Sequence, residues 1–207
     1  MNGLLQSTMF LAPLEVYAYY LQYSDITIEH CENYQKRSYR NRAYLSGPNG
    51  LSLLSIPLLK GKNRGTPIEE VRIAYHENWE GNMLHTIRTC LGSAPYFDYY
   101  YDELAELIKS KTSHLLELNQ RLLEYVLKHI GVSLQVHQST TYEKESKLAD
   151  LRAYKGGPTE SSLNLYPQVF EEKHGYIHNL SILDLLFCMG PESRSILSQI
   201  TLPLKFS

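Results

Sequence analysis

The hydrophobic pattern of the chain predicts an α/β fold, and three features support this prediction. A strand, a helix and a second strand follow one another within residues 3–29, which is typical of a parallel βαβ unit. Residues 39–58 carry the pattern of a β-hairpin, and from residue 78 onward apolar residues recur at helical spacing. We therefore expect a mixed sheet with a β-hairpin insertion and helices packed against it, with an α+β arrangement as the alternative.

The length and composition of the chain indicate one domain. Its 207 residues, 43% hydrophobic and 20% charged, are enough for a sizeable core. Single domains reach about 200–250 residues before the chain divides. We therefore expect residues 1–207 to form a single domain.

The first thirty residues account for the parallel part of the expected fold. Residues 3–7 have the pattern of a short strand, and Pro13 can occupy the first turn of a helix that runs to Gln22. Residues 25–29 alternate between polar and apolar side chains, which predicts a second strand. Because a helix between two strands allows parallel pairing, we expect these strands to be neighbours.

The next segment predicts antiparallel strands. Residues 39–45 and 51–58 flank residues 47–50, whose Gly, Pro and Asn favour a tight turn. The second arm is apolar on both faces and is therefore predicted to be a central strand. Residues 60–67 form a cationic, glycine-rich loop, and residues 71–75 are predicted to be another strand.

The second half of the chain is predicted to be mainly helical. Asn78 is a candidate N-cap of a helix that ends at Gly92. Ser181 and Asp184 form a variant capping box at the start of a helix that ends at Gly190. The remaining predicted elements are helices at 98–109, 113–130 and 192–199, and a strand at 132–136.

Two segments lack a clear period. Residues 138–157 are polar and rich in Lys and Glu, so we interpret them as a solvated face or a flexible lid. Residues 166–171 fit a short strand and a short helix equally well.

The charge and composition exclude several classes of function. The formal net charge is −2 and the pI is about 6.4, whereas nucleic-acid-binding domains typically exceed a pI of about 9, so we expect no nucleic-acid partner. No window reaches the ~18 apolar residues of a membrane span. Cys31, Cys90 and Cys188 show no disulfide or metal spacing, which indicates reduced thiols and a cytoplasmic location.

Tyrosine is over-represented, with 17 residues against 5 Phe and 1 Trp. The tyrosine side chain combines an apolar ring with a polar tip, so it suits half-buried surfaces, grooves and interfaces. One interpretation is that these residues replace Phe at the rim of the core. The alternative is that they line a ligand site or, at Tyr99, Tyr100 and Tyr101, the interface of a homo-oligomer.

The most distinctive segment is 33–42, which holds four cations, two Asn or Gln amides besides Asn33, two tyrosines and a serine. If residues 39–45 form a strand, Arg40 and Arg42 share one face and can bind one anion together, while Asn41 lies on the opposite face. Lys36 adds charge from the preceding loop. The segment thus predicts a site for an anion, and the alternative is an edge strand whose cations prevent aggregation.

Histidines are the next candidates for chemistry. His76 follows a predicted strand, a position where functional groups often lie, and is the candidate acid or base. His174 and His178 have the i, i+4 spacing of a metal pair, but no third ligand is evident, so we expect no metal. The glycine-rich nucleotide motifs, the GxSxG motif and an acidic DxD pair are absent, and we expect no cofactor.

The chain resembles the WbqC-like family in several segments that keep their order along the sequence. The resemblance rests on residues 32–42, on Leu54-Ser55-Ile56-Pro57, on Ala94-Pro95-Tyr96-Phe97, and on residues 179–187 with Gly190-Pro191. Many members of that family carry a His-Gln-Pro motif at the end of the first strand. Here the corresponding residues are Leu5-Gln6-Ser7, so only Gln6 matches the motif.

The resemblance implies a transferase-like protein of bacterial surface polysaccharide (O-antigen type) biosynthesis. Its substrate would be a small anionic or nucleotide-linked molecule. The alternative is a binding or assembly protein that has lost the catalytic function together with the histidine of the motif. The residues expected to serve the substrate are Gln6 and His76 in catalysis and Tyr34, Lys36, Arg40, Asn41, Arg42 and Tyr96 in binding.

Overall fold

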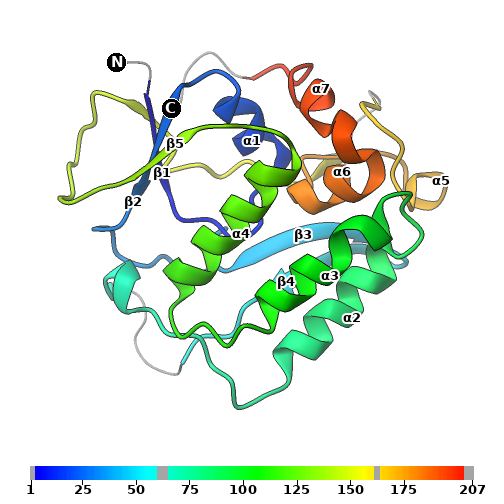
Figure 1. Ribbon diagram of the computed structural model, residues 1–207, viewed down its shortest axis with the longest axis horizontal. Coiled ribbons are helices and arrows are strands. Elements are labelled where there is room, and N and C mark those ends of the chain that lie inside the picture. Colours follow the sequence, from blue (N-terminus) through cyan, green and yellow to red (C-terminus); the bar gives the residue numbers. More distant parts are fainter. Residues whose placement is uncertain (1–2, 60–64, 161–163, 203–207) are drawn as a thin grey trace.

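Four parallel strands form the larger sheet of the molecule. The computed structural model describes residues 3–59, 65–160 and 164–202 (Figure 1). The strands are β1 (Gly3–Ser7), β2 (Asp25–Glu29), β5 (Gln135–Gln138) and β6 (Ala149–Asp150), in the order β5-β2-β1-β6. All three neighbouring pairs are parallel, as a βαβ opening predicts.

The α/β prediction is confirmed, and the first two strands lie where the sequence places them. The helix between them is α1 (Leu14–Tyr20), which follows Pro13. The late strand begins at Gln135 rather than at Val132. β6 lies inside the polar segment 138–157, where its two residues gave no periodic signal.

An antiparallel hairpin forms a second sheet. β3 (Arg42–Gly47) and β4 (Gly50–Ser55) pair in the register Gly47↔Gly50, so the hairpin prediction is confirmed. The first strand starts at Arg42 and not at residue 39, because residues 39 and 40 form a turn.

The prediction of a central strand for the second arm is wrong. Within the described chain, β4 has β3 as its only strand neighbour. Its Leu51 and Leu53 are 52% and 46% exposed, while Leu54 is buried beneath α2 (Trp79–Leu91). An apolar pattern on both faces therefore does not distinguish a central strand from an edge strand that exposes two leucines.

Residues 71–75 were predicted to form a strand but make only isolated bridges. Ile73 pairs with Leu58, and Arg72 pairs with His114. A short 3-10 helix, η1 (Ile68–Glu70), precedes them. Of the predicted cationic loop, residues 60–64 lie outside the described residues.

The predicted helices are present, and their caps explain where they begin and end. The Asn78 side chain accepts a hydrogen bond from the Gly81 N–H at 3.2 Å at the start of α2. Gly131 adopts a φ of +66° after α4 (Leu115–His129), a conformation that favours glycine. The other helices are α3 (Phe97–Ile108), α5 (Glu171–His174), α6 (Ile182–Met189), η2 (Gly190–Glu192) and α7 (Ser193–Leu197).

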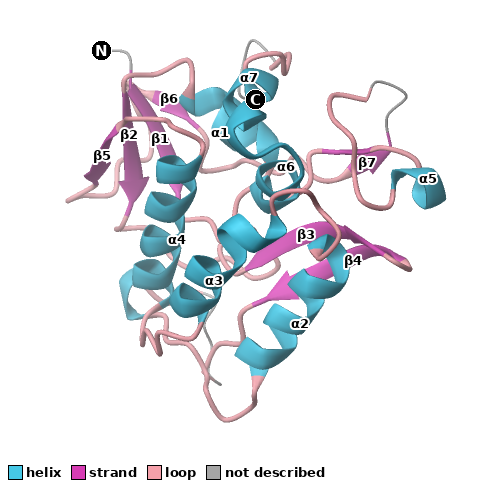
Figure 2. Cartoon of the chain, turned by 45° about the vertical axis from the view of Figure 1, so that its right-hand side comes forward, coloured by secondary structure: helices cyan, strands magenta, loops and turns pink. Residues whose placement is uncertain are grey.

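The C-terminal part of the chain packs against the β3–β4 hairpin and the helices around it. Seven of the eight residues of α6 are buried, and α6 contacts α1, α2, α3 and β3 (Figure 2). A small hairpin, β7 (Thr159–Glu160) with β8 (Ile177–His178), lies just before this helix. Ser181 caps α6, but Asp184 does not complete the capping box: it is buried and accepts a hydrogen bond from the Tyr166 hydroxyl at 2.9 Å.

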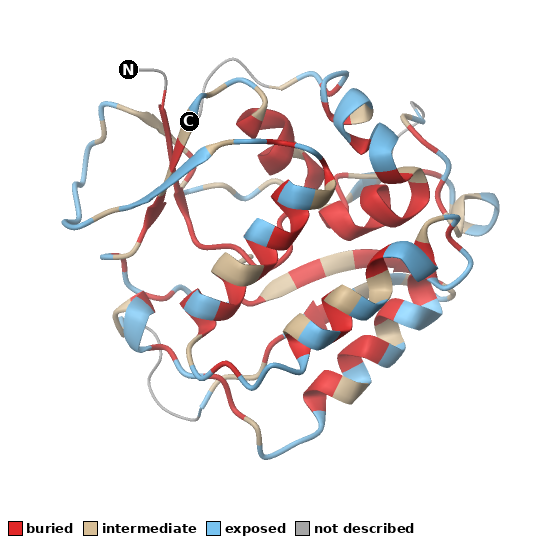
Figure 3. Ribbon diagram, viewed as in Figure 1, coloured by how far each residue is buried: buried red, intermediate tan, exposed pale blue. Residues whose placement is uncertain are grey.

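The hydrophobic core includes residues of the four-stranded sheet and of the β3–β4 hairpin. Figure 3 shows the buried residues concentrated in β1, α1, α6 and the inner faces of α2, α3 and α4. None of the helices in the described part of the chain is both long and apolar enough to cross a membrane.

Candidate functional site

A basic groove lies where the parallel strands end. Its volume is about 1150 Å³. Besides Gly65, two segments far apart in the sequence line it: residues 31–44, which follow β2, and residues 142–158, which include the end of β6. Ligands of parallel sheets typically bind at the carboxyl ends of the strands. The predicted anion site and the predicted lid therefore face the same groove.

Arg40 lies in the floor of this groove as part of a buried ion pair. Its Nε donates to Glu32 Oε1 at 2.9 Å and its Nη2 donates to Ser7 Oγ at 2.6 Å. Arg40 and Glu32 are 4% and 5% exposed. Because Glu32 neutralises its charge, Arg40 attracts an anion in the groove only weakly. Its role is to stabilise the groove floor.

Arg152 forms a second ion-pair network beside the first. Its guanidinium contacts Asp150 Oδ2 at 2.6 Å and Glu29 Oε2 at 3.2 Å. Burial alone would raise the pKa of Asp150, but the hydrogen bonds and the charge of Arg152 outweigh this effect and lower the pKa. Asp150 and Glu29 are thus already paired with Arg152, as Glu32 is with Arg40.

Five other cations of the groove have no acidic partner. They come from both lining segments and form no ion pair with any residue that the structure describes: Lys36, Arg37, Arg42, Lys144 and Lys155. In addition, the buried Nε of Arg42 has no hydrogen-bond partner. Unpaired cations around one groove create a positive potential that an anion would relieve.

Three tyrosine rings form one wall of the groove. The ring centroid of Tyr39 lies 6.2 Å from that of Tyr44 and 6.0 Å from that of Tyr154. The Tyr154 hydroxyl donates to Glu15 Oε2 at 2.6 Å and accepts from Asn179 Nδ2 at 2.8 Å, and burial raises the pKa of Tyr154. The hydroxyl is therefore held on the far side of the wall, and the ring is held in place for stacking.

Tyr34 and Asn41 hold the loop between β2 and β3 together. The Tyr34 hydroxyl donates to Asn41 Oδ1 at 2.9 Å, and Asn41 Nδ2 donates to the carbonyl of Ile56 at 2.9 Å. Both side chains are buried, and Tyr34 also lines the groove. Among the predicted binding residues, Tyr34, Lys36, Arg40 and Arg42 thus meet at the groove, and Asn41 supports them from behind.

Two predicted site residues lie elsewhere. His76 is exposed, and its Nε2 lies 3.7 Å from Glu77 Oε1. Tyr96 packs on the rings of Tyr99 and Tyr100 and beneath Gly190. Neither His76 nor Tyr96 lines the groove.

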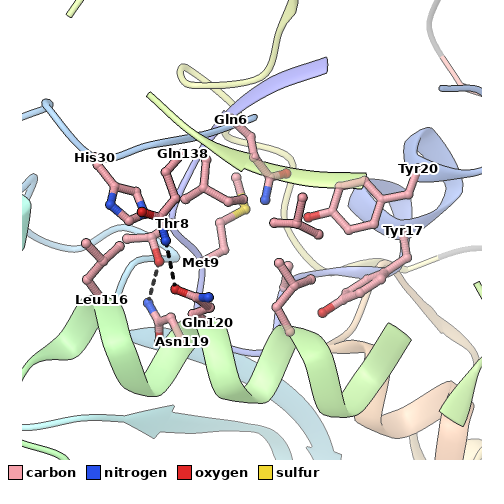
Figure 4. Close-up of a pocket in the computed structure, with 14 residues that line it drawn as sticks. Gln6, Thr8, Met9, Tyr17, Tyr20, His30, Leu116, Asn119, Gln120 and Gln138 are labelled. Atoms are coloured by element: carbon pink, nitrogen blue, oxygen red, sulfur yellow. Dashed lines mark hydrogen bonds between the residues drawn. The ribbon is translucent and has the colours of Figure 1, made fainter. Parts of the chain in front are cut away.

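Gln6 faces a small cavity on the opposite side of β1 from Ser7. Side chains alternate along a strand, so Ser7 lies in the groove floor while Gln6 points toward α4 (Figure 4). Gln6 is 2% exposed, and its Oε1 has no hydrogen-bond partner among the described residues. The tertiary structure therefore separates Gln6 from the basic cluster.

Little in the sequence indicates the second wall of the groove, residues 142–158. Asp150 and Arg152, two residues apart in the sequence, form a local salt bridge. The mixture of Tyr and Lys residues in 142–155 could have indicated this wall, because segment 33–42 contains the same mixture. In the described ranges, no group of three or more His, Cys, Asp or Glu residues could hold a metal ion.

Two comparisons with known proteins found similar sequences. The chain matches the sequence profile of the WbqC-like protein family over residues 11–156, which include both lining segments up to Gly156. A protein of Mycobacterium tuberculosis described as uncharacterized is 27% identical over 195 residues, covering 77% of this chain and 81% of its own length. No solved structure matches the chain significantly.

Proposed function

Because the chain belongs to the WbqC-like protein family, we propose that it is a transferase-like protein of bacterial surface polysaccharide (O-antigen type) biosynthesis that acts on an anionic, activated substrate. The observation that carries this proposal is the groove with five unpaired cations on two facing segments. Phosphate and carboxylate groups are the anions that Arg and Lys bind best. A nucleotide-linked or phosphate-linked donor is the substrate class that fits.

The cations of the groove have two roles. Some would bind the substrate, and others stabilise the groove floor through ion pairs. Arg42 and Lys36 on one segment and Lys155 on the other would contact the anionic group of the substrate. Arg40 and Arg152 keep the two segments in place through Glu32, Glu29 and Asp150. The tyrosine wall would stack on a sugar or on a nucleoside base.

Unpaired cations also suit a transfer reaction. When an activated donor loses a phosphate-bearing leaving group, negative charge accumulates on that group, and fixed cations stabilise it. A catalytic role for Gln6, or for His76 as the base, requires a substrate that extends beyond the groove, because neither residue lines it. We place this activity in the cytoplasm, where free thiols such as Cys31, Cys90 and Cys188 stay reduced.

A thermal-shift screen of nucleotide sugars and of acyl or aminoacyl donors tests the proposal. We expect at least one anionic donor to stabilise the protein, and we expect Arg42→Ala and Lys155→Ala each to weaken its binding at least tenfold. Arg72→Ala is the matched control, because Arg72 is exposed and lies outside the groove. If no donor binds, or if Arg72→Ala weakens binding as much as Arg42→Ala, the proposal fails.

One observation favours a binding protein without catalysis as the second candidate. Gln6 is flanked by Leu5 and Ser7 instead of the His and Pro of the family motif, and Ser7 is engaged by Arg40. A protein of this kind would bind the anionic donor in the groove without turnover. Product analysis with the best-binding donor and an acceptor panel separates the two candidates.

A further inference from the structure

The β3–β4 hairpin has one covered face and one open face. Leu45 and Leu54 lie on the covered face, where both are buried and α2 packs on both strands (Figure 2). Side chains alternate along a strand, so Arg42 and Tyr44 project from the open face. Both of these residues line the basic groove. The open face of the hairpin is therefore part of the groove.

The open face continues from the groove onto exposed leucines of β4. The strand register places Leu53 opposite Tyr44 and Leu51 opposite Ser46. Residues directly opposite each other in an antiparallel pair project from the same face and lie within contact range. Leu51 and Leu53 are 52% and 46% exposed, more than any other leucine that the structure describes. Single exposed leucines are common on protein surfaces, but two neighbours that extend a basic groove form an apolar strip beside it.

We propose that the substrate of the groove is an amphiphilic anion, a phosphate monoester that carries an aliphatic chain. The inference rests on the proposed function and narrows its substrate class. The phosphate group would bind Arg42 and the other unpaired cations of the groove. The chain would run past the Tyr44 ring onto the apolar strip of Leu53 and Leu51, where it covers apolar surface that is otherwise in contact with water.

The spacing of residues along the strand sets the length of this chain. Side chains on one face of a strand recur about every 7 Å, so Leu51 lies about 14 Å along the hairpin from Arg42, the length of an aliphatic chain of about ten carbon atoms. Arg42 pairs with Ser55 at one end of the hairpin, and the turn after Gly47 ends the strip at the other. A longer chain would pass beyond the hairpin and gain little further contact.

The shape of the basic surface favours a single bound molecule over a membrane surface. The unpaired cations come from two segments that line a groove, Arg42 and Lys36 on one and Lys155 on the other. The phosphate group of one molecule can enter this groove, whereas the headgroups of a bilayer form a flat surface outside it. The formal net charge of −2 also provides no overall attraction to an anionic membrane.

Calorimetric titration with methyl, butyl, hexyl and octyl phosphate tests the proposal, each ester below the concentration at which it forms micelles. We expect the affinity to rise about twofold per methylene group, half of the free-energy gain of full burial, because the chain lies on an open face. Octyl phosphate should therefore bind about a hundredfold more tightly than methyl phosphate. Equal affinities overturn the inference and leave the proposed function intact. If no ester binds, the inference fails, and the donor screen shows whether the proposed function fails as well.

Variants of the two leucines locate the chain on the apolar strip. The double variant Leu51→Thr/Leu53→Thr keeps residues that suit a strand, and it should weaken octyl phosphate binding at least tenfold without changing that of methyl phosphate. Val136→Thr is the matched control, because Val136 is an exposed strand residue outside the groove. Arg42→Ala should weaken both esters by a similar factor. Octyl phosphate binding that is unchanged in the double variant overturns the inference.

Two further measurements exclude other occupants of the strip. Octyltrimethylammonium has the same chain with the opposite charge, so it should bind at least tenfold more weakly than octyl phosphate. Equal binding of the two would show association with any apolar chain and overturns the inference. Vesicles of phosphatidylcholine with about 20% phosphatidylglycerol should not sediment with the protein. Sedimentation that Arg42→Ala abolishes would assign the face to a membrane surface instead.

Discussion

At the scale of single residues, the buried carboxylates have opposite roles. Glu32 is paired with Arg40 in the groove floor, at an Nη2–Oε2 distance of 2.5 Å. Asp184 is also buried but has no cationic partner: its Oδ1 accepts from Tyr166 and its Oδ2 has no partner among the described residues. Glu32 stabilises the fold only while Arg40 is present. Asp184 makes the free energy of unfolding depend on pH.

We predict that Glu32→Gln strongly destabilises the protein. Removal of this carboxylate leaves Arg40 as a buried, uncompensated charge, which typically costs about 3–5 kcal/mol. Urea denaturation measures the loss. Glu103→Gln removes the half-exposed carboxylate that pairs with Lys128 and His129, and should cost no more than about 1 kcal/mol. Equal losses in the two variants would contradict the structural role assigned to Arg40.

We predict that Asp184 lowers the free energy of unfolding as pH rises. Burial raises its pKa from 3.8 to about 7, against the smaller lowering effect of the Tyr166 hydrogen bond. The folded state therefore binds more protons than the unfolded state between about pH 4 and pH 7, so the stability from this group is present below pH 4 and lost as pH rises to 7. The total change is on the order of 4 kcal/mol.

The measurement is the difference in free energy of unfolding between wild type and Asp184→Asn at a series of pH values. The other carboxyl groups cancel in this difference. We expect the wild type to lose stability relative to the variant from pH 4 to pH 7, and the difference to level off above pH 7. A difference that stays constant over this range would show that Asp184 titrates normally in the folded protein.

At the scale of elements, the backbone of the segment after β6 lies close to the side chains of Tyr154 and Glu15. A Cβ at Gly156 would meet the Tyr154 hydroxyl and would lie 2.9 Å from Glu15 Oε2, so a side chain there requires these groups to shift. The Tyr154–Glu15 contact connects this segment to the first turn of α1. The position of the groove wall is thus set by the N-terminus of a helix that does not line the groove.

We predict that Gly156→Ala weakens binding of an anionic ligand in the groove at least fivefold, because the added methyl displaces the Tyr154 ring. Gly157→Ala is a matched control: its Cβ would lie 3.7 Å from the Tyr39 hydroxyl, which is ordinary contact. Calorimetric titration of the best ligand from the donor screen measures both variants. Equal affinities in the two variants would mean that the wall does not depend on this approach.

At the scale of the whole molecule, the groove combines cations from two segments that are distant in the sequence. Because these cations have no acidic partners in the described part of the chain, the positive potential of the groove comes from arrangement and not from net charge, which is −2. We expect ligand affinity to fall about five- to tenfold between 50 mM and 500 mM NaCl, as salt screens the cations. Calorimetry at several salt concentrations measures this change, and an affinity independent of salt would argue for recognition by the tyrosine wall alone.

The prediction of local elements from the sequence succeeded where periodicity and caps were strong. The helices that begin after Asn78 and Ser181 and the strand pair 3–7 and 25–29 follow from side-chain spacing and turn chemistry, which act over a few residues. The errors arose where a non-local partner decided the outcome. β4 was misjudged because exposure depends on its neighbours, and β6 was missed because β1, not its own composition, makes it a strand.

The sequence by itself determined the α/β class, most helix boundaries, the family and the unusual cation density of segment 33–42. Only the tertiary structure decided which of these cations are free: it buries Arg40 against Glu32 and brings Lys144 and Lys155 toward Arg42. It also turns Gln6 away from the groove and leaves His76 at the surface. The reason is physical, since secondary structure depends mainly on neighbouring residues, whereas the charge and accessibility of a side chain depend on partners that folding brings from elsewhere in the chain.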